Sequence, residues 1–132
     1  MGDPGTISVE ASARRYADKV ELTLWLHIPD GAHVEAHEPP DPALIPTVVE
    51  FTDLEARSVS YPEPVEKDLG LPGPPLLVYE GSISVTAEGR ADETLQIARG
   101  TIRYQPCVGG ACLPPREQTW QVPIEPAAPS GY

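Results

Sequence analysis

The sequence has no long hydrophobic stretch and few basic residues. No window holds the roughly eighteen apolar residues that a membrane-spanning helix needs, and residues 1–20 lack the apolar core of a signal peptide. Lysine and arginine together number 9 against 20 acidic residues, which gives a formal net charge of -11. A chain this acidic is a poor partner for nucleic acid or for an anionic membrane surface. We therefore expect no nucleic-acid binding and no direct membrane insertion.

Uninterrupted helical stretches are also missing. The 17 prolines and 11 glycines are spread along the chain, and no segment offers about ten residues of helical period free of them. At 132 residues the chain is long enough for one domain with its own hydrophobic core. We expect a single domain over residues 1–125 and a C-terminal tail or linker over residues 126–132. The opening residues 1–5 are typical of a trimmed or mature chain.

Alternation of apolar and polar residues takes the place of helical periodicity. In residues 19–27 (KVELTLWLH) four apolar side chains point to one face, and the residues between them point to the other. Similar short runs occur at residues 6–11, 46–51, 56–61, 76–88, 93–104 and 119–124. Seven to nine short strands separated by turns predict an all-β fold, and we favour an antiparallel β-sandwich over a barrel.

Two proline-rich segments interrupt this pattern. Residues 36–46 and 61–75 are expected to form irregular but ordered connections, because each proline ring fixes a backbone angle. The second segment is too long for a simple hairpin loop. Loops of this length inside a compact domain are usually functional or disordered, so residues 61–75 are a candidate functional loop.

Motifs for common catalytic or cofactor chemistry are absent. The chain has no Ser/His/Asp arrangement, no glycine-rich phosphate loop and no nucleotide-binding fingerprint. His33 and His37 could join the two cysteines around zinc, but four residues of extended chain span about 13 Å, too far for one ion. We expect no cofactor and no metal site. We expect the three histidines, at positions 27, 33 and 37, to be partly exposed polar residues.

The chain contains only two cysteines, Cys107 and Cys112, in the stretch YQPCVGGACLPP. They flank Gly109 and Gly110, which can adopt the positive φ angles of a tight turn, so the sulfurs can come within bonding range. A disulfide that closes such a small ring stabilises a fold by only about 2 kcal/mol. This weak effect favours a redox pair, but a structural disulfide remains an alternative.

The cysteine motif resembles a known family. Tyr104, Gln105, Cys107, Cys112 and the prolines 114 and 115 match the pattern of the N-terminal extracytoplasmic domain of the thiol:disulfide interchange protein DsbD. Upstream stretches that support the resemblance are LWLHIPDGAHVEAHEPP, YPEPVEKDLG and VYEGSISVTA. Together these segments extend over roughly residues 7–125.

The resemblance implies an immunoglobulin-like β-sandwich in the periplasm with a redox-active cysteine hairpin. It implies thiol:disulfide interchange, that is protein-disulfide reductase activity, by a monomeric domain that is free-standing or a fragment of a larger enzyme. Electrons would come from a thioredoxin-like domain and a membrane reductase. They would pass to thioredoxin-fold acceptors, either disulfide isomerases or proteins of cytochrome c maturation.

The resemblance also assigns roles to individual residues. Cys112 would form the mixed disulfide with partners, and Cys107 would resolve it. The family covers its cysteines with a loop that carries an aromatic residue, but residues 62–75 contain none. We expect Leu69 or Leu71 to cover the sulfurs instead, with Tyr61, Tyr104 and Pro114 around the site. The alternative function is a non-enzymatic interaction module with a purely structural hairpin disulfide.

Overall fold

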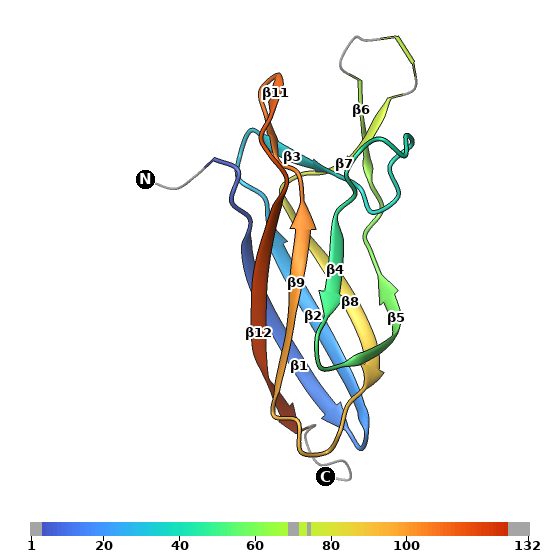
Figure 1. Ribbon diagram of the computed structural model, residues 1–132, viewed down its shortest axis with the longest axis vertical. Coiled ribbons are helices and arrows are strands. Elements are labelled where there is room, and N and C mark those ends of the chain that lie inside the picture. The colour runs from blue at the N-terminus through green and yellow to red at the C-terminus, as the bar shows by residue number, and fades with distance from the viewer. Residues whose placement is uncertain (1–3, 69–71, 74, 127–132) are drawn as a thin grey trace.

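The computed structural model describes residues 4–68, 72–73 and 75–126, and within them the fold is all-β (Figure 1). No helix in this part of the chain is long and apolar enough to cross a membrane. The strands are β1 (Ser8–Tyr16), β2 (Lys19–His27), β3 (Ala32–Glu35), β4 (Val48–Phe51), β5 (Glu55–Ser60), β6 (Val65–Lys67), β7 (Leu76–Tyr79), β8 (Ser82–Arg90), β9 (Ile97–Tyr104), β10 (Cys107–Val108), β11 (Ala111–Cys112) and β12 (Arg116–Pro126).

The larger sheet forms both layers of a sandwich. Its strand order is β4-β9-β12-β1-β2-β8-β5, and Figure 1 shows β4 and β9 crossing in front of β2 and β8. Neighbours in this sheet pair antiparallel, as expected, except for β1 and β12, which run parallel. This parallel pair joins the two layers along one side, so the first and last long strands close the sandwich together.

The hydrophobic core lies between these layers. The four apolar residues of β2 that alternate in the sequence are at most 2% exposed, which confirms the predicted inward face. From the opposite layer, β9 contributes Ala98, Ile102 and Tyr104, and β12 contributes Trp120 and Val122. Period-two alternation therefore predicted the core-facing side of β2 correctly.

The smaller sheet, of order β11-β10-β3-β7-β6, occupies one end of the sandwich (Figure 1). Neither β3 nor β6 was predicted as a strand. The segment 61–75, expected to be irregular, contains β6, because Val65–Lys67 pair antiparallel with β7 and satisfy their backbone hydrogen bonds there. β3 is buried on both faces. His33, expected to be partly exposed, is in fact buried, with 5% of its surface exposed.

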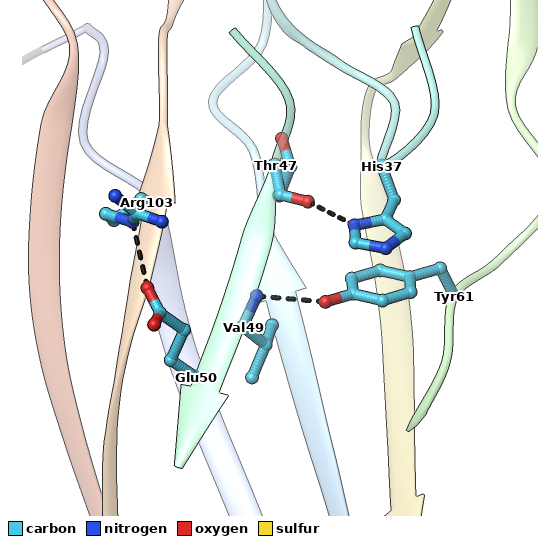
Figure 2. Close-up of polar contacts among 6 residues, drawn as sticks. All are labelled: His37, Thr47, Val49, Glu50, Tyr61 and Arg103. Carbon is cyan, nitrogen blue, oxygen red and sulfur yellow. Dashed lines mark hydrogen bonds and ion pairs between the residues drawn. The ribbon is translucent and has the colours of Figure 1, made fainter. Parts of the chain in front are cut away.

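The two proline-rich connections are held to β4 by polar contacts (Figure 2). The ring of His37 stacks on that of Tyr61 with centroids 3.7 Å apart, and its Nδ1 donates a hydrogen bond to the carbonyl oxygen of Thr47 at 3.0 Å. The Tyr61 hydroxyl accepts a hydrogen bond from the backbone N–H of Val49 at 3.0 Å. These contacts fix the ends of both connections beside the smaller sheet.

Candidate functional site

The two cysteines lie directly opposite each other on a short hairpin. β10 and β11 pair antiparallel with Cys107 facing Cys112, and the two sulfurs form a disulfide of 1.98 Å. Gly109 carries the turn with a φ of 63°, which glycine adopts without strain. Figure 1 shows this hairpin projecting beyond β9 and β12. The spacing Cys-x4-Cys thus places the two cysteines on strands that flank a tight turn, as the sequence predicted.

The base of the hairpin is held by hydrogen bonds to two backbone carbonyl oxygens. The N–H of Leu113 donates a hydrogen bond to the carbonyl oxygen of Pro106 at 2.8 Å, and the side-chain amide of Gln105 donates one to the carbonyl oxygen of Leu113 at 3.1 Å. Gly5 packs so closely here that a Cβ would approach Leu113 and Pro106 to 2.9 Å. The N-terminal segment therefore supports the hairpin from the side.

The two halves of the disulfide differ in accessibility. Cys107 is only 6% exposed and Cys112 is exposed. β10 is an inner strand of the smaller sheet, flanked by β11 and β3, and β11 is the edge strand. An incoming thiolate can therefore reach the sulfur of Cys112 more readily than that of Cys107.

The cysteines share one face of the smaller sheet with several ionisable residues. Cys107 pairs directly with Cys112 on one side and with His33 on the other. Side chains of directly paired residues lie on the same face of an antiparallel sheet. Val34 and Tyr79, which form the next pair, belong to the hydrophobic core. The face with His33, Glu35 and the disulfide is therefore the one turned away from the core, and we call it the sulfur-bearing face.

Charged groups surround His33 on this face. The ammonium of Lys67 pairs with the carboxylate of Glu80 at 2.9 Å. Burial lowers the pKa of His33, the positive charge of Lys67 lowers it further, and Glu80 acts in the opposite direction. Burial also raises the pKa of Glu35, whose Oε2 has no hydrogen-bond partner within the described residues. Near neutral pH His33 is therefore an uncharged imidazole.

Three residues that we expected around the sulfurs lie in three different environments. Tyr104 is fully buried in the core, where its hydroxyl accepts a hydrogen bond from the N–H of Ile7 at 3.2 Å and donates one to Gln118. Tyr61 is part of the contacts in Figure 2. Pro114 is exposed just after the hairpin. The core position of Tyr104 indicates a structural role that joins β9 and β12 to the segment just before β1.

The proposed covering residues Leu69 and Leu71 lie outside the described residues, so their role stays a prediction. The arginines nearest to the cysteines in sequence have other partners. Arg103 pairs with Glu50 at 2.9 Å (Figure 2), and Arg116 donates a hydrogen bond to the Thr6 hydroxyl at 3.1 Å. Lys67, which is more distant in sequence, is a basic residue of the sulfur-bearing face.

Sequence reasoning missed four residues of the sulfur-bearing face: His33, Glu35, Lys67 and Glu80. A signal for the first two is present in residues 32–37 (AHVEAH), where apolar and polar residues alternate as in a strand. Lys67 and Glu80 carry no such signal, because their approach depends on the pairing of β6 with β7 and of β7 with β3. Within the described residues, no three metal-ligating side chains gather in one place.

The sequence matches no model of a known protein family, and a search of curated proteins finds no match either. The structure is similar to the reduced N-terminal domain of DsbD from Neisseria meningitidis, with a TM-score of 0.55, 21% identity, and coverage of 87% of this chain and 83% of that one. It is also similar to the N-terminal periplasmic domain of ScsB from Proteus mirabilis, with a TM-score of 0.63 and 13% identity. That match covers 86% of this chain and 44% of the ScsB chain.

A third match is a complex of the DsbD and PilB N-terminal domains from Neisseria meningitidis, with a TM-score of 0.49, 19% identity, and coverage of 86% of this chain and 80% of that one. The first two matches confirm, for the fold, the resemblance seen in the sequence. The chain has the immunoglobulin-like β-sandwich fold of the DsbD N-terminal domain.

Proposed function

We propose that this protein is an extracytoplasmic thiol–disulfide exchange domain whose Cys107–Cys112 pair alternates between disulfide and dithiol. The observation that carries the proposal is the disulfide on a projecting hairpin, with Cys112 exposed and Cys107 buried. One accessible sulfur and one protected sulfur are what an exchange reaction needs, because a partner must attack one specific atom. The fold shared with the DsbD N-terminal domain supports the same function.

Reduction of the domain takes two thiols from a donor protein. A donor thiolate attacks Sγ of Cys112, the Cys107–Cys112 bond breaks, and Cys107 leaves as a thiolate that takes up a proton. The second donor thiol loses its proton and attacks the donor sulfur of this mixed disulfide, which releases Cys112. The donor is then oxidised to a disulfide and the domain carries two thiols.

Transfer to an acceptor runs through the same atoms. The Cys112 thiolate attacks the acceptor disulfide, and the acceptor's leaving sulfur takes up a proton. Cys107 then loses its proton, attacks Sγ of Cys112, re-forms the disulfide and releases the second acceptor sulfur. The domain is oxidised by two electrons and the acceptor is reduced by two.

The partners we propose are thioredoxin-fold proteins. The donor is a thioredoxin-like domain that receives its electrons from a membrane reductase. The acceptors are periplasmic disulfide isomerases or thioredoxin-like proteins of cytochrome c maturation. The resemblance of the cysteine motif to the DsbD family supports this assignment, as does the edge position of β11, which leaves Cys112 open to a docking protein. The same resemblance supports a periplasmic location, a monomeric domain and protein-disulfide reductase activity.

Equilibration of the protein with dithiothreitol or glutathione buffers of graded potential tests this function. We expect reversible reduction of the disulfide at a potential between about -300 and -120 mV, the range of known exchange proteins. In a transfer assay with a thioredoxin-fold disulfide protein, Cys112→Ser should abolish reduction of the partner. Cys107→Ser should instead accumulate the mixed disulfide, because the resolving thiol is missing.

A reduction potential below about -300 mV would contradict the proposal, because structural disulfides have potentials in that range. It would favour the interaction module with a structural disulfide. Equal loss of partner reduction in both cysteine variants, with no mixed disulfide in either, would contradict the different roles assigned to Cys107 and Cys112.

A further inference from the structure

Three residues form one row across the sulfur-bearing face. Cys112 on β11, Cys107 on β10 and His33 on β3 are paired in direct register, so Cys107 lies between Cys112 and the histidine. Side chains of directly paired residues have Cβ atoms about 4.5–5.5 Å apart, within reach of one another. The imidazole of His33 is therefore the ionisable side chain next to Cys107 on the side opposite Cys112.

The environment of His33 differs from that of the other two histidines. Its side chain is buried, and within the described part of the chain neither ring nitrogen has a hydrogen-bond partner. By contrast, Nδ1 of His27 lies 2.9 Å from the Ser82 hydroxyl, and Nδ1 of His37 donates to Thr47. The ring of His33 is thus placed next to Cys107 with its one unprotonated nitrogen available to bind a proton.

We propose that His33 accepts the proton of the Cys107 thiol when Cys107 attacks the mixed disulfide, and that in the reverse step it takes up a proton from water and passes it to Cys107 as that sulfur leaves. This inference rests on the proposed function, since it concerns a step of the exchange reaction. It assigns His33 as a proton acceptor and donor for the buried cysteine, whereas the exposed Cys112 exchanges protons with water.

The proton and electron balance of the closing step is simple. The Cys107 thiol gives its proton to the free imidazole nitrogen of His33, and its sulfur lone pair forms the new bond to Sγ of Cys112. The bond from Cys112 to the partner sulfur breaks, and the partner leaves as a thiolate. The imidazolium then passes its proton to the departing thiolate or to water, which restores neutral His33.

Burial explains why an acceptor is needed at Cys107. A thiol with the ordinary pKa of about 8.5 is only about 3% ionised at pH 7, and apolar surroundings disfavour the thiolate further. A neutral imidazole beside the thiol removes this restriction, because it takes the proton during the attack. The lowered pKa of His33 keeps the ring neutral and ready to accept a proton near neutral pH.

Other ionisable groups near His33 are less suited to this role. Lys67 on β6 and Glu80 after β7 neutralise each other in an ion pair of 2.9 Å. Glu35 lies two residues further along β3, and its register partner on β7 is Val78. Of these four ionisable residues, His33 is the one whose register partner is Cys107.

Closure of the hairpin disulfide can be timed without any protein partner. Reduced protein is mixed with one equivalent of dithiobis(nitrobenzoate), which releases one coloured thiolate when Cys112 attacks and a second when Cys107 closes the ring. The second phase is recorded by stopped flow from about pH 5 to pH 9 for the wild type and His33→Gln. His27→Gln, which removes a histidine on β2 of the other sheet, is the matched control.

We expect His33→Gln to slow the second phase about tenfold at pH 7. Without the imidazole only the ionised thiol can attack, and because it makes up about 3% of Cys107, the rate can fall by at most roughly thirtyfold. The wild type should lose rate below about pH 6.5 as His33 is protonated. His33→Gln should lose this inflection and follow thiol ionisation alone. The first phase, the reduction potential at pH 7 and all data for His27→Gln should be unchanged.

A second phase within twofold of the wild type at pH 7, with the inflection retained in His33→Gln, would overturn the inference. If His33→Gln fails to fold, NMR of the reduced wild type decides: the His33 ring signal should shift as Cys107 ionises, and no shift overturns the inference. A structural-range potential combined with His33-dependent closure would refute the proposed function and leave the proton transfer in place. A mid-range potential with closure independent of His33 would support the proposed function and overturn the proton transfer.

Discussion

Two buried ionisable side chains, His33 and Glu35, stand two residues apart on the same strand, and burial affects them in opposite directions. The charged form is disfavoured in both, so the pKa of the imidazole falls and the pKa of the carboxyl rises. Both residues are therefore neutral over part of the pH range in which exposed groups of the same type carry charge. This makes the sulfur-bearing face less charged than its composition indicates.

The stability of the protein should depend on the ionisation of Glu35. Since its folded-state pKa is raised, its contribution is fully present below the unfolded pKa of 4.5 and is lost as pH rises through the folded-state pKa. Glu35→Gln should therefore be more stable than the wild type at pH 7, by on the order of 1 kcal/mol. Urea unfolding from acid to neutral pH measures this difference.

Glu93→Gln, which removes a carboxylate from an exposed turn, is the control for this experiment. On the acid side, the dependence of the free energy of unfolding on pH includes a contribution from His33. Its lowered pKa means that stability present above about pH 6.5 is lost as pH falls through the folded-state pKa. A Glu35→Gln variant with the wild-type pH dependence would show that this carboxyl does not titrate with folding.

At the scale of elements, the pairing of β9 with both β4 and β12 depends on a residue without a side chain. Gly100 lies opposite Trp120 on one side and next to Glu50 on the other. A Cβ at this position would collide with the indole ring of Trp120 and with the carbonyl oxygen of Glu50. The ring of Phe51 packs edge-on against the indole, with the two ring centroids 5.6 Å apart, so Trp120 has little room to move.

We expect Gly100→Ala to destabilise the protein by about 2 kcal/mol, since overpacking of a core typically costs about 1–3 kcal/mol. Gly110→Ala is the matched control, because an added Cβ there meets no atom within 4 Å. Thermal and urea unfolding of both variants provide the comparison. Equal stability of Gly100→Ala and the wild type would mean that the strands shift to accommodate the methyl group.

At the scale of the whole molecule, the disulfide contributes little to the fold. The ring that it closes is short, with a sequence separation of 5, and gives only about 2 kcal/mol by loop entropy. Each fully buried Val, Leu or Ile side chain contributes about 1.5–3 kcal/mol, and the core between the layers contains many of them. The sandwich can therefore remain folded while the hairpin bond opens and closes.

Reduction of the protein with dithiothreitol should lower the free energy of unfolding by about 2 kcal/mol or less and leave a cooperative transition. The double variant with Cys107→Ala and Cys112→Ala should behave like the reduced protein. Circular dichroism during urea unfolding, in oxidising and reducing buffer, measures the effect. Loss of cooperative unfolding on reduction would indicate a structural disulfide.

Much of the sandwich could be predicted from local pattern. The alternation in β2, β8 and β9 depends only on which residues face the core, and a period of two is visible in the sequence itself. The spacing of Cys107 and Cys112 around two glycines likewise placed the pair on a turn, because residues so close in sequence must meet there. The short strands β3 and β6 were not predicted, since their hydrogen bonds depend on partners distant in sequence.

The all-β class, the inward face of β2 and the cysteine hairpin could be predicted without a structure, because they follow from interactions among residues close together in the chain. The burial of Cys107, the exposure of Cys112 and the position of His33 beside Cys107 depend instead on how distant segments pack together. These features arise where β3, β10 and β11 meet in one sheet. Pairing between segments more than seventy residues apart depends on the global packing of the chain, which no local pattern encodes.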